Sequence, residues 1–342
     1  MTQPPGTLYL IGLGLGDARD LTLRGRDAIA SSDRVFLECY TSILGVGADA
    51  LSAAFGKPVE LAHRETVESE ADTILAPAVG GQTVSFLVVG DPFGATTHTD
   101  LLLRAHAAGV PTRVVHNASI MNAVGACGLQ LYTFGQTISI PFFRDAWQPD
   151  SFYDRIAHNA SGGLHTLCLL GAFCVRARGV PLPYVYPSPP PPARVTIPCP
   201  ASPIPRADIK VRELDFGLLA RTGRKAYLPP RFMTIRRAIL QLLAVERKRG
   251  RGVCPPGALA VGVARVGQDA QRIVSGTLEQ LAGVDFGGPL HSLVLAGGPL
   301  HEVEAAMVAH FAVKPEELGA YEEEFSEEWD GECAAEGGGE GR

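Results

Sequence analysis

The 342-residue sequence predicts an α/β protein made of two α/β domains. Three observations lead to this fold class. Short apolar runs that end in glycine alternate with segments of helical periodicity, as in chains that form parallel sheets. Hydrophobic residues make up 46% of the chain and charged residues 19%, a composition typical of folded globular proteins. After about residue 118 the strand pattern changes, which indicates a second domain.

Apolar runs predict strands in both halves of the chain. In the first half they lie at 8–12, 35–37, 84–89 and 113–116. In the second half they lie at 137–140, 165–170, 259–265 and 291–295. The run at 8–12 is suited to a strand that is buried on both faces of a parallel sheet.

Three segments show the spacing of a helix with one apolar face. The first has this face at Leu21, Gly25, Ala28 and Ile29. Either Asp20 or Thr22 is its expected N-cap. A second helix is predicted over 101–108, because Gly109 and Pro111 follow it. The third has its apolar face at Ile235, Ala238, Ile239, Leu242 and Leu243.

Two segments differ from the rest in composition. Residues 181–205 hold 11 of the 26 prolines, so we expect a solvated spacer there. Residues 316–342 hold 11 acidic residues and one basic residue and are rich in glycine, which predicts a disordered acidic tail. Residues 1–315 then carry 29 basic against 25 acidic residues, an excess too small to indicate nucleic-acid binding.

Composition also argues against several classes of protein. No run approaches the ~18 apolar residues of a membrane span, and the N-terminus lacks a signal-peptide pattern. Seven cysteines without any C-x-x-C spacing argue against a zinc ribbon and against a secreted disulfide framework. We therefore expect a cytoplasmic protein without a metal site. The predicted organisation is a flexible N-terminus (1–6), an N-terminal domain (7–117), a C-terminal domain (118–315) and the acidic tail (316–342).

Two glycine-rich loops follow predicted strands and are candidate ligand sites. The first, at 12–17, has the spacing G-x-G-x-G, and the second, at 90–94, contains Asp91. A plain tight turn and a nucleotide-like ligand are equally compatible with the first loop. Because the carboxyl ends of parallel strands meet at one edge of a sheet, we expect the two loops to share a crevice. Ser119 fits the N-cap of a following helix, and simple capping is favoured there over binding of an anion.

Six blocks of the sequence resemble the diphthine synthase family, within the tetrapyrrole methylase-like class of S-adenosylmethionine methyltransferases. The blocks are LYLIGLGLGD (8–17), LECYTS (37–42), VGDPFGATTH (89–98), HNASIMNA (116–123), GVARVG (262–267) and PLHSL (289–293). With one interruption, the resemblance covers about residues 7–313. It implies a fold of tetrapyrrole methylase type, with a cofactor cleft between the two α/β domains of a homodimeric enzyme.

The resemblance also implies a reaction and a set of cofactor contacts. The substrate would be elongation factor 2, at a histidine that carries a 3-amino-3-carboxypropyl group, in diphthamide biosynthesis. Trimethylation of the amine and, in eukaryotes, methyl esterification of the carboxylate would follow. The residues implied to bind S-adenosylmethionine are Leu15, Asp91, Gly94, Ser119, Ile120, Leu170, Val266 and His291. No catalytic residue is assigned, because transfer from a sulfonium mainly requires alignment of the reactants.

The sequence departs from the family pattern in one place. In the family, the segment at Leu170 runs directly into the segment that begins here at Asp208, so residues 171–207 are a 37-residue interruption. Either this segment loops out to solvent or it is retained intron sequence, and we favour the second interpretation.

Three alternatives to this function stay open. A methyltransferase of a tetrapyrrole precursor would share the fold, but the long specific blocks disfavour it. A nicotinamide-dependent oxidoreductase is disfavoured because the first glycine loop lacks G-x-G-x-x-G spacing. A non-catalytic binding module is expected only if the interruption breaks the second domain.

Overall fold

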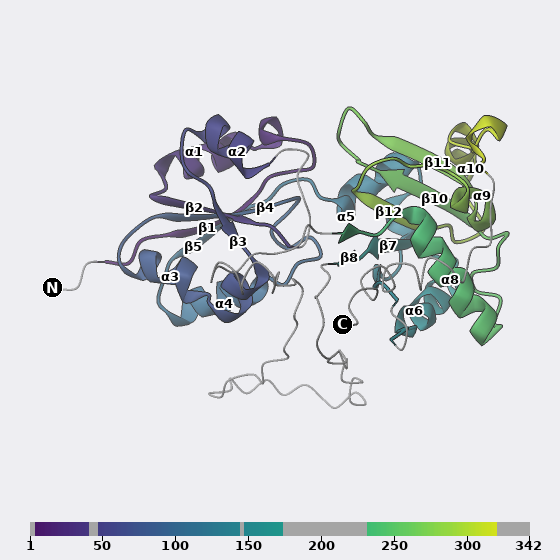
Figure 1. Ribbon diagram of the computed structural model, residues 1–342, viewed down its shortest axis with the longest axis horizontal. Helices are drawn as coiled ribbons and strands as arrows, with labels where there is room; N and C mark the ends of the chain where they lie inside the picture. The colour runs from purple at the N-terminus through teal and green to yellow at the C-terminus, as the bar shows by residue number, and fades with distance from the viewer. Residues whose placement is uncertain (1–3, 41–46, 144–146, 174–230, 320–342) are drawn as a thin grey trace, which may run out of the picture. The chain divides into compact units, whose positions relative to one another are not determined.

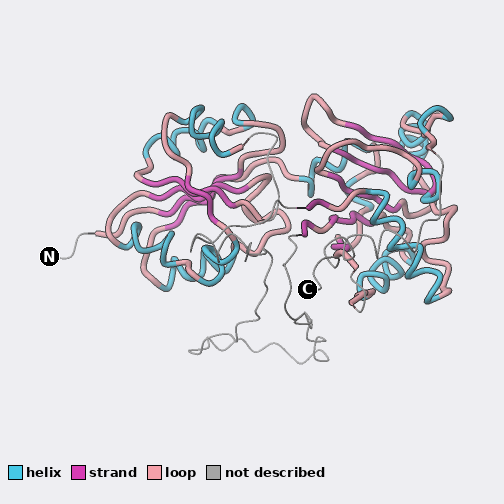
Figure 2. The backbone as a smooth tube through the Cα atoms, viewed as in Figure 1, coloured by secondary structure: helices cyan, strands magenta, loops and turns pink. Residues whose placement is uncertain are grey.

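Two five-stranded sheets form the framework of the protein (Figure 1 and Figure 2). The computed structural model describes residues 4–40, 47–143, 147–173 and 231–319. The chain divides into one compact unit of residues 1–173 with 231–342 and another of 174–230. The second unit lies outside the described residues, as do the predicted proline-rich spacer and nearly all of the predicted interruption. Both sheets belong to the first unit.

The first sheet is parallel throughout, in the order β3-β2-β4-β1-β5. Its strands are β1 (Leu8–Gly12), β2 (Arg34–Glu38), β3 (Glu60–Ala62), β4 (Val84–Val88) and β5 (Thr112–Val115). The two central strands, β1 and β4, are almost wholly buried, which explains their continuous apolar runs. All four strands predicted in this half are confirmed.

Helices cover both faces of the first sheet, α1 and α2 on one and α3 and α4 on the other (Figure 1). They are α1 (Leu23–Ser31), α2 (Ala48–Phe55), α3 (Asp72–Val79) and α4 (Thr99–Ala107). The face predicted for the first helix is confirmed at Gly25, Ala28 and Ile29, which are buried, whereas Leu21 lies before the helix begins. Of the two predicted N-caps Thr22 is correct, and its hydroxyl accepts a hydrogen bond from the Gly25 amide at 3.0 Å.

The second sheet is mixed, in the order β11-β10-β12-β7-β6. Its strands are β6 (Ile138–Ile140), β7 (Thr166–Leu170), β10 (Leu259–Ala264), β11 (Arg272–Thr277) and β12 (His291–Leu295). Only β6 and β7 run parallel to each other, and the other pairs are antiparallel. A two-stranded ladder, β8 (Ala172–Phe173) with β9 (Arg231–Phe232), follows β7. The α/β fold class and all four strands predicted in this half are confirmed.

Two clusters of apolar side chains bury the faces of the second sheet. The described α-helices of this half are α5 (Ile120–Ala123), α6 (Ser151–Ser161), α8 (Ile235–Arg249), α9 (Leu278–Ala282) and α10 (Glu302–His310). Among the described residues, the other helical turns are η1 (Ala18–Asp20), η2 (Glu65–Ser69), η3 (Val124–Cys127), η4 (Leu131–Thr133) and η5 (Pro315–Glu317). The apolar face predicted for α8 is buried against α6, α9 and the sheet, which confirms that helix.

The start of the predicted acidic tail takes part in the fold. Glu316 and Glu317 lie in η5, and the Glu317 carboxylate pairs with Arg272 at 2.8 Å. The Gly319 amide donates to the Gly283 carbonyl at 3.1 Å. Residues 320–342, for which disorder was expected, lie outside the described residues. Within the described part of the chain, no helix has the length and apolar character of a membrane span.

Candidate functional site

The first glycine loop leaves β1 and is held from inside by an aspartate. Asp20 Oδ2 accepts hydrogen bonds from the Leu15 amide at 3.2 Å and the Gly16 amide at 2.7 Å. Gly14 has φ of +79°, a conformation that glycine adopts without strain. Because a carboxylate already occupies these amide donors, they are not available to a phosphate, unlike the amides of a dinucleotide-binding loop.

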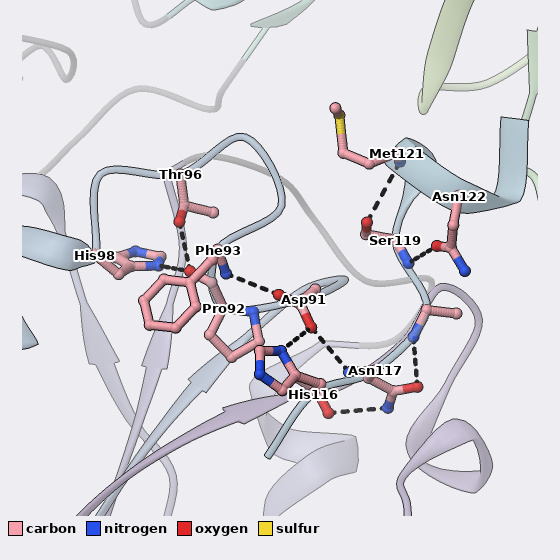
Figure 3. Close-up of polar contacts among 12 residues, drawn as sticks. Asp91, Pro92, Phe93, Thr96, His98, His116, Asn117, Ser119, Met121 and Asn122 are labelled. Carbon is pink, nitrogen blue, oxygen red and sulfur yellow. Dashed lines mark hydrogen bonds and ion pairs between the residues drawn. The ribbon is translucent and has the colours of Figure 1, made fainter. Parts of the chain in front are cut away.

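The second glycine loop is organised around Asp91 (Figure 3). Asp91 Oδ1 accepts from the Phe93 amide at 2.9 Å, and Oδ2 accepts from the Asn117 amide at 3.1 Å. The His116 ring nitrogen Nδ1 lies 2.8 Å from the same Oδ2. The contacts of Asp91 are therefore not confined to one turn, because His116 and Asn117 belong to the segment that follows β5.

The pKa of Asp91 reflects these contacts. Burial acts to raise the pKa of its carboxyl group, but the hydrogen bonds from Phe93, Asn117 and His116 outweigh burial and bring the pKa below its usual value. The carboxylate therefore stays ionised at neutral pH. It is a fixed negative charge at the carboxyl end of β4, with 15% of its side chain exposed.

The two glycine loops lie side by side, as expected from their positions after neighbouring strands. The Gly90 amide donates to the Gly14 carbonyl at 2.8 Å, and the Gly14 amide donates to the Gly90 carbonyl at 3.3 Å. The Asn117 side-chain amide donates to the carbonyls of Gly12 at 2.9 Å and Asp20 at 3.0 Å. Asn117 thus joins the first loop to the segment that holds the second.

The N-terminus of the helix α5, at Ser119, lies beside the second glycine loop. Ser119 is the N-cap of α5: its hydroxyl accepts from the Met121 amide at 3.3 Å, and its own amide donates to Asn122 Oδ1 at 2.8 Å (Figure 3). The position of Ser119 as an N-cap, predicted from the sequence, is confirmed. Gly94 packs against this cap, since a Cβ atom there would lie 2.8 Å from Ser119 Oγ. Asp91, Gly94, Ser119 and Ile120 therefore come from adjoining segments.

Three of the other predicted contacts lie at one end of the second sheet. Ala264 pairs with His291, and Leu169 pairs with Ser292. Leu170 at the end of β7, Val266 just after β10 and His291 at the start of β12 are therefore at the same end of three neighbouring strands. The antiparallel order of these strands is not predictable from their apolar runs, which therefore provide no reason to group the three residues.

His291 has a defined hydrogen-bonding arrangement. Its Nδ1 accepts from the Ile235 amide at 3.4 Å, so Nε2 carries the proton and donates to the Gly288 carbonyl at 2.8 Å. Burial lowers the pKa of the imidazole, and the charge of Arg265 lowers it further. His291 is therefore neutral at pH 7 and part of the loop framework.

Leu15 connects the two groups of residues. Its carbonyl accepts a hydrogen bond from Gln268 Nε2 at 3.0 Å, although the two residues are 253 positions apart. Gly267 has φ of +81°, and a Cβ atom there would lie 3.0 Å from Leu15 Cβ. The first glycine loop and the turn after β10, which contains Val266, are thus in direct contact.

Backbone strain is concentrated beside these residues. Within the described ranges, three residues other than glycine have positive φ: Ala95 at 63°, Arg265 at 49° and Leu290 at 75°. Each is the immediate neighbour of a predicted contact: Gly94, Val266 and His291, respectively. Conformations of this kind cost on the order of 1–3 kcal/mol and occur preferentially at ligand sites.

Sequence reasoning missed the residues that assemble the site. Asp20 was considered only as a helix cap, and neither His116 nor Asn117 was assigned a role. The available signal was the polar pair His116-Asn117 directly after a strand, at the same sheet edge as the two loops. In the described part of the chain, no group of three or more histidine, cysteine, aspartate or glutamate side chains is arranged to hold a metal.

Substitution of Gly12 tests whether the end of β1 must lie this close to Gly90 and Asn117. A Cβ atom at Gly12 would lie 2.5 Å from the Gly90 carbonyl oxygen and 2.8 Å from Asn117 Cβ. We expect Gly12→Ala to push these segments apart and to lower the free energy of unfolding by about 1–3 kcal/mol, measured by denaturant titration. Gly257→Ala is the control, because nothing lies within 4 Å of that added methyl group. Equal stability of the two variants would contradict the close approach.

The chain resembles known proteins over most of its length. The model of the tetrapyrrole (corrin/porphyrin) methylases matches residues 7–177. The chain is 48% identical over 310 residues to the diphthine methyl ester synthase of Homo sapiens, covering 90% of this chain and 95% of that protein. It is 47% identical over 308 residues to the enzyme of that name in Schizosaccharomyces pombe, with the same coverage. A crystal structure of a diphthine synthase, 28% identical, superposes with a TM-score of 0.66 over 90% of this chain and 96% of the other.

Proposed function

Because the chain belongs to the tetrapyrrole (corrin/porphyrin) methylase family and is a methyltransferase, we propose that it forms diphthine methyl ester on elongation factor 2 with S-adenosylmethionine as methyl donor. The observation that carries this proposal is the 48% identity to the human diphthine methyl ester synthase, which extends over almost the whole of both chains. The substrate is a histidine of elongation factor 2 that already carries a 3-amino-3-carboxypropyl group.

The cofactor site in this proposal consists of the eight residues expected from the sequence: Leu15, Asp91, Gly94, Ser119, Ile120, Leu170, Val266 and His291. The closeness of Leu15 to Gly267 and Gln268 supports a single site made from both groups. The occupied amides of the first loop fit a donor with a cationic sulfonium better than a dinucleotide, whose pyrophosphate needs free amide donors. We place the division between the domains at residues 117 and 118.

The chain's contribution to the reaction is alignment of the reactants. S-adenosylmethionine supplies a methyl group on a sulfonium, a good leaving group. Holding nucleophile and methyl group in line supplies on the order of 7–11 kcal/mol of the barrier. The substrate carboxylate is ionised near pH 7 and needs no base, whereas each amine must lose a proton before it attacks. The rigid contacts of Asp91, Asn117 and His291 suit a site that works by positioning.

The same proposal includes the oligomeric state, the location and the partners of the enzyme. We propose a homodimer that acts in the cytoplasm on a protein substrate, with no nucleic-acid or membrane partner. The small positive charge of residues 1–315 suits approach to a protein but does not select one.

Methylation of purified elongation factor 2 tests the function directly. With S-adenosylmethionine and the factor carrying the unmethylated 3-amino-3-carboxypropyl histidine, we expect mass spectrometry to show four added methyl groups. Three groups would indicate the betaine product without the ester, and none would overturn the assignment. A tetrapyrrole precursor and NAD serve as controls. Methylation of the precursor would support the tetrapyrrole methyltransferase. Calorimetric binding of NAD in place of S-adenosylmethionine would support the oxidoreductase.

A further inference from the structure

A second group of polar side chains lies at the carboxyl ends of β2, β3 and β4. Tyr40 follows β2, Arg64 lies just before η2 and Glu68 lies in it. Thr97 and His98 lie between the second glycine loop and α4. We refer to these five residues as the Arg64 cluster. None of them is among the eight residues assigned to the cofactor.

Direct contacts join the members of the Arg64 cluster. The Tyr40 hydroxyl lies 3.4 Å from His98 Nε2, and the Arg64 guanidinium lies 5.0 Å from the centre of the Tyr40 ring. The Thr97 hydroxyl donates to Glu68 Oε1 at 3.3 Å. The cluster is therefore one connected unit of side chains from three strand ends.

The cluster is also attached to the proposed cofactor loop. His98 Nδ1 donates to the Pro92 carbonyl at 3.1 Å, and the Thr96 hydroxyl donates to the same oxygen (Figure 3). Pro92 follows Asp91 directly. A group bound by the Arg64 cluster would thus lie beside the loop that carries Asp91 and Gly94.

The ion pair between Arg64 and Glu68 is loosely made. Arg64 Nε lies 3.7 Å from Glu68 Oε1, whereas strong charge-assisted hydrogen bonds measure about 2.7–2.9 Å. Arg64 Nε is buried and makes no hydrogen bond. The side chains as a whole remain 16% and 25% exposed, so part of each reaches solvent. By contrast, Arg34 and Glu60, on the first residues of β2 and β3, are 2.5 Å apart and joined by two hydrogen bonds.

Only Arg64 supplies positive charge in this cluster. Burial lowers the pKa of His98 to about 4, so its imidazole is neutral at pH 7. Burial also raises the pKa of the Tyr40 phenol, which keeps its proton. One positive and one negative charge, 3.7 Å apart and incompletely hydrogen-bonded, are complementary to a small group that carries a carboxylate and an ammonium on one carbon.

We propose that Arg64 and Glu68 form the subsite for the aminocarboxyl end of the modified histidine, a role that rests on the proposed function. Arg64 donates to the substrate carboxylate, and Glu68 accepts from the substrate ammonium. The zwitterion inserts between Arg64 and Glu68. It supplies the hydrogen-bond partners that these two side chains do not supply to each other. Esterification then neutralises the carboxylate, so the finished methyl ester loses its partner at Arg64 and is released more readily.

The test compares Arg64→Gln with Arg34→Gln, a change in an ion pair at the opposite ends of the same two strands. In the wild-type protein with S-adenosylhomocysteine present, we expect elongation factor 2 that carries the unmethylated aminocarboxyl group to bind at least tenfold more tightly than its methyl ester. Arg64→Gln should abolish this preference and raise KM for the factor at least tenfold. Arg34→Gln should leave both unchanged.

Further measurements separate recognition from a structural effect. Arg64→Gln should bind S-adenosylmethionine within twofold of the wild type in calorimetry. Glu68→Gln, which keeps the shape of the side chain, should weaken binding of the unmethylated factor without altering cofactor binding. If Arg64→Gln fails to fold, Arg64→Lys replaces it, with a smaller but still measurable loss of the preference.

The outcomes are distinguishable. A wild-type protein that binds no S-adenosylmethionine or methylates no elongation factor 2 overturns the proposed function. A fully active wild type whose Arg64 and Glu68 variants keep the normal preference for the unmethylated factor overturns only the subsite. Parallel losses of cofactor and substrate binding would assign the pair a structural role and would equally overturn the subsite.

Discussion

Asp91→Asn is expected to weaken binding of S-adenosylmethionine by at least tenfold while the protein stays folded. The substitution keeps the shape of the side chain but removes its charge. Oδ2 accepts from both Asn117 and His116, and an amide group turned toward them would place donor against donor. Hydrogen bonds to charged groups contribute about 1.5–3 kcal/mol each, so loss of one accounts for a tenfold effect and loss of both for more. Calorimetric titration measures the change in Kd.

Asp100→Asn is the matched control for this variant. Asp100 lies in α4, directly after the same loop, and pairs with Arg104 at 2.6 Å, with half of its side chain exposed. An exposed pair of this kind contributes about 0–1 kcal/mol, so cofactor binding should stay within twofold of the wild type. If Asp91→Asn bound the cofactor as tightly as Asp100→Asn does, Asp91 would not organise the site.

The strands and the loops that carry the site were predictable because each depends on short-range pattern. The run at 8–12 is apolar at every position except its final glycine, and the structure buries β1 in the middle of a parallel sheet. Gly14 and Gly90 occupy positions of positive φ, where glycine is the residue expected. Knowing only that both loops follow strands of one sheet was enough to predict that they meet.

The side chains that hold these loops together were not predictable in the same way. Asn117 reaches the Gly12 carbonyl across 105 positions, and His116 reaches Asp91 across 25. These contacts depend on β1 lying between β4 and β5, an order that periodicity within each strand does not specify. The resemblance to a family supplied Leu170 and Val266 without a physical reason. The antiparallel pairing of β12 with both neighbours provides one for their shared location.

Some elements lacked a sequence signal strong enough to detect. The helix α3 contains Pro77, which normally argues against a helix interior, and β3 has only three residues. The strand β11 pairs along its whole length with β10, but its segment mixes apolar residues with Ser275 and Gly276. Tertiary contacts rather than local preference determine these elements: α3 packs against the first sheet, and β3 and β11 pair with β2 and β10.

Glu304→Ala is expected to destabilise the protein by about 3–5 kcal/mol. Glu304 is 2% exposed, and its two oxygens accept from the amides of Gln130 and His301, the Thr133 hydroxyl and His165 Nε2. Removing the carboxylate leaves the buried His165 ring and the part-buried amides of Gln130 and His301 without this acceptor. Glu302→Ala, an exposed position in the same first turn of α10, should cost less than about 1 kcal/mol in denaturant unfolding.

The pH dependence of the unfolding free energy separates the contribution of the Glu304 charge from that of its packing. Burial acts to raise the pKa of this carboxyl, but its hydrogen bonds outweigh burial and lower the pKa from 4.5 to about 2. A lowered pKa means that the folded state favours the ionised form, so this stabilisation is complete above pH ~4.5 and is lost as the pH falls toward ~2. Glu304→Gln cannot titrate. The difference in unfolding free energy between wild type and Glu304→Gln should therefore be largest near pH 7 and shrink between pH ~4.5 and ~3. A difference that stayed constant over this range would show that the stabilisation comes from packing rather than from the carboxylate.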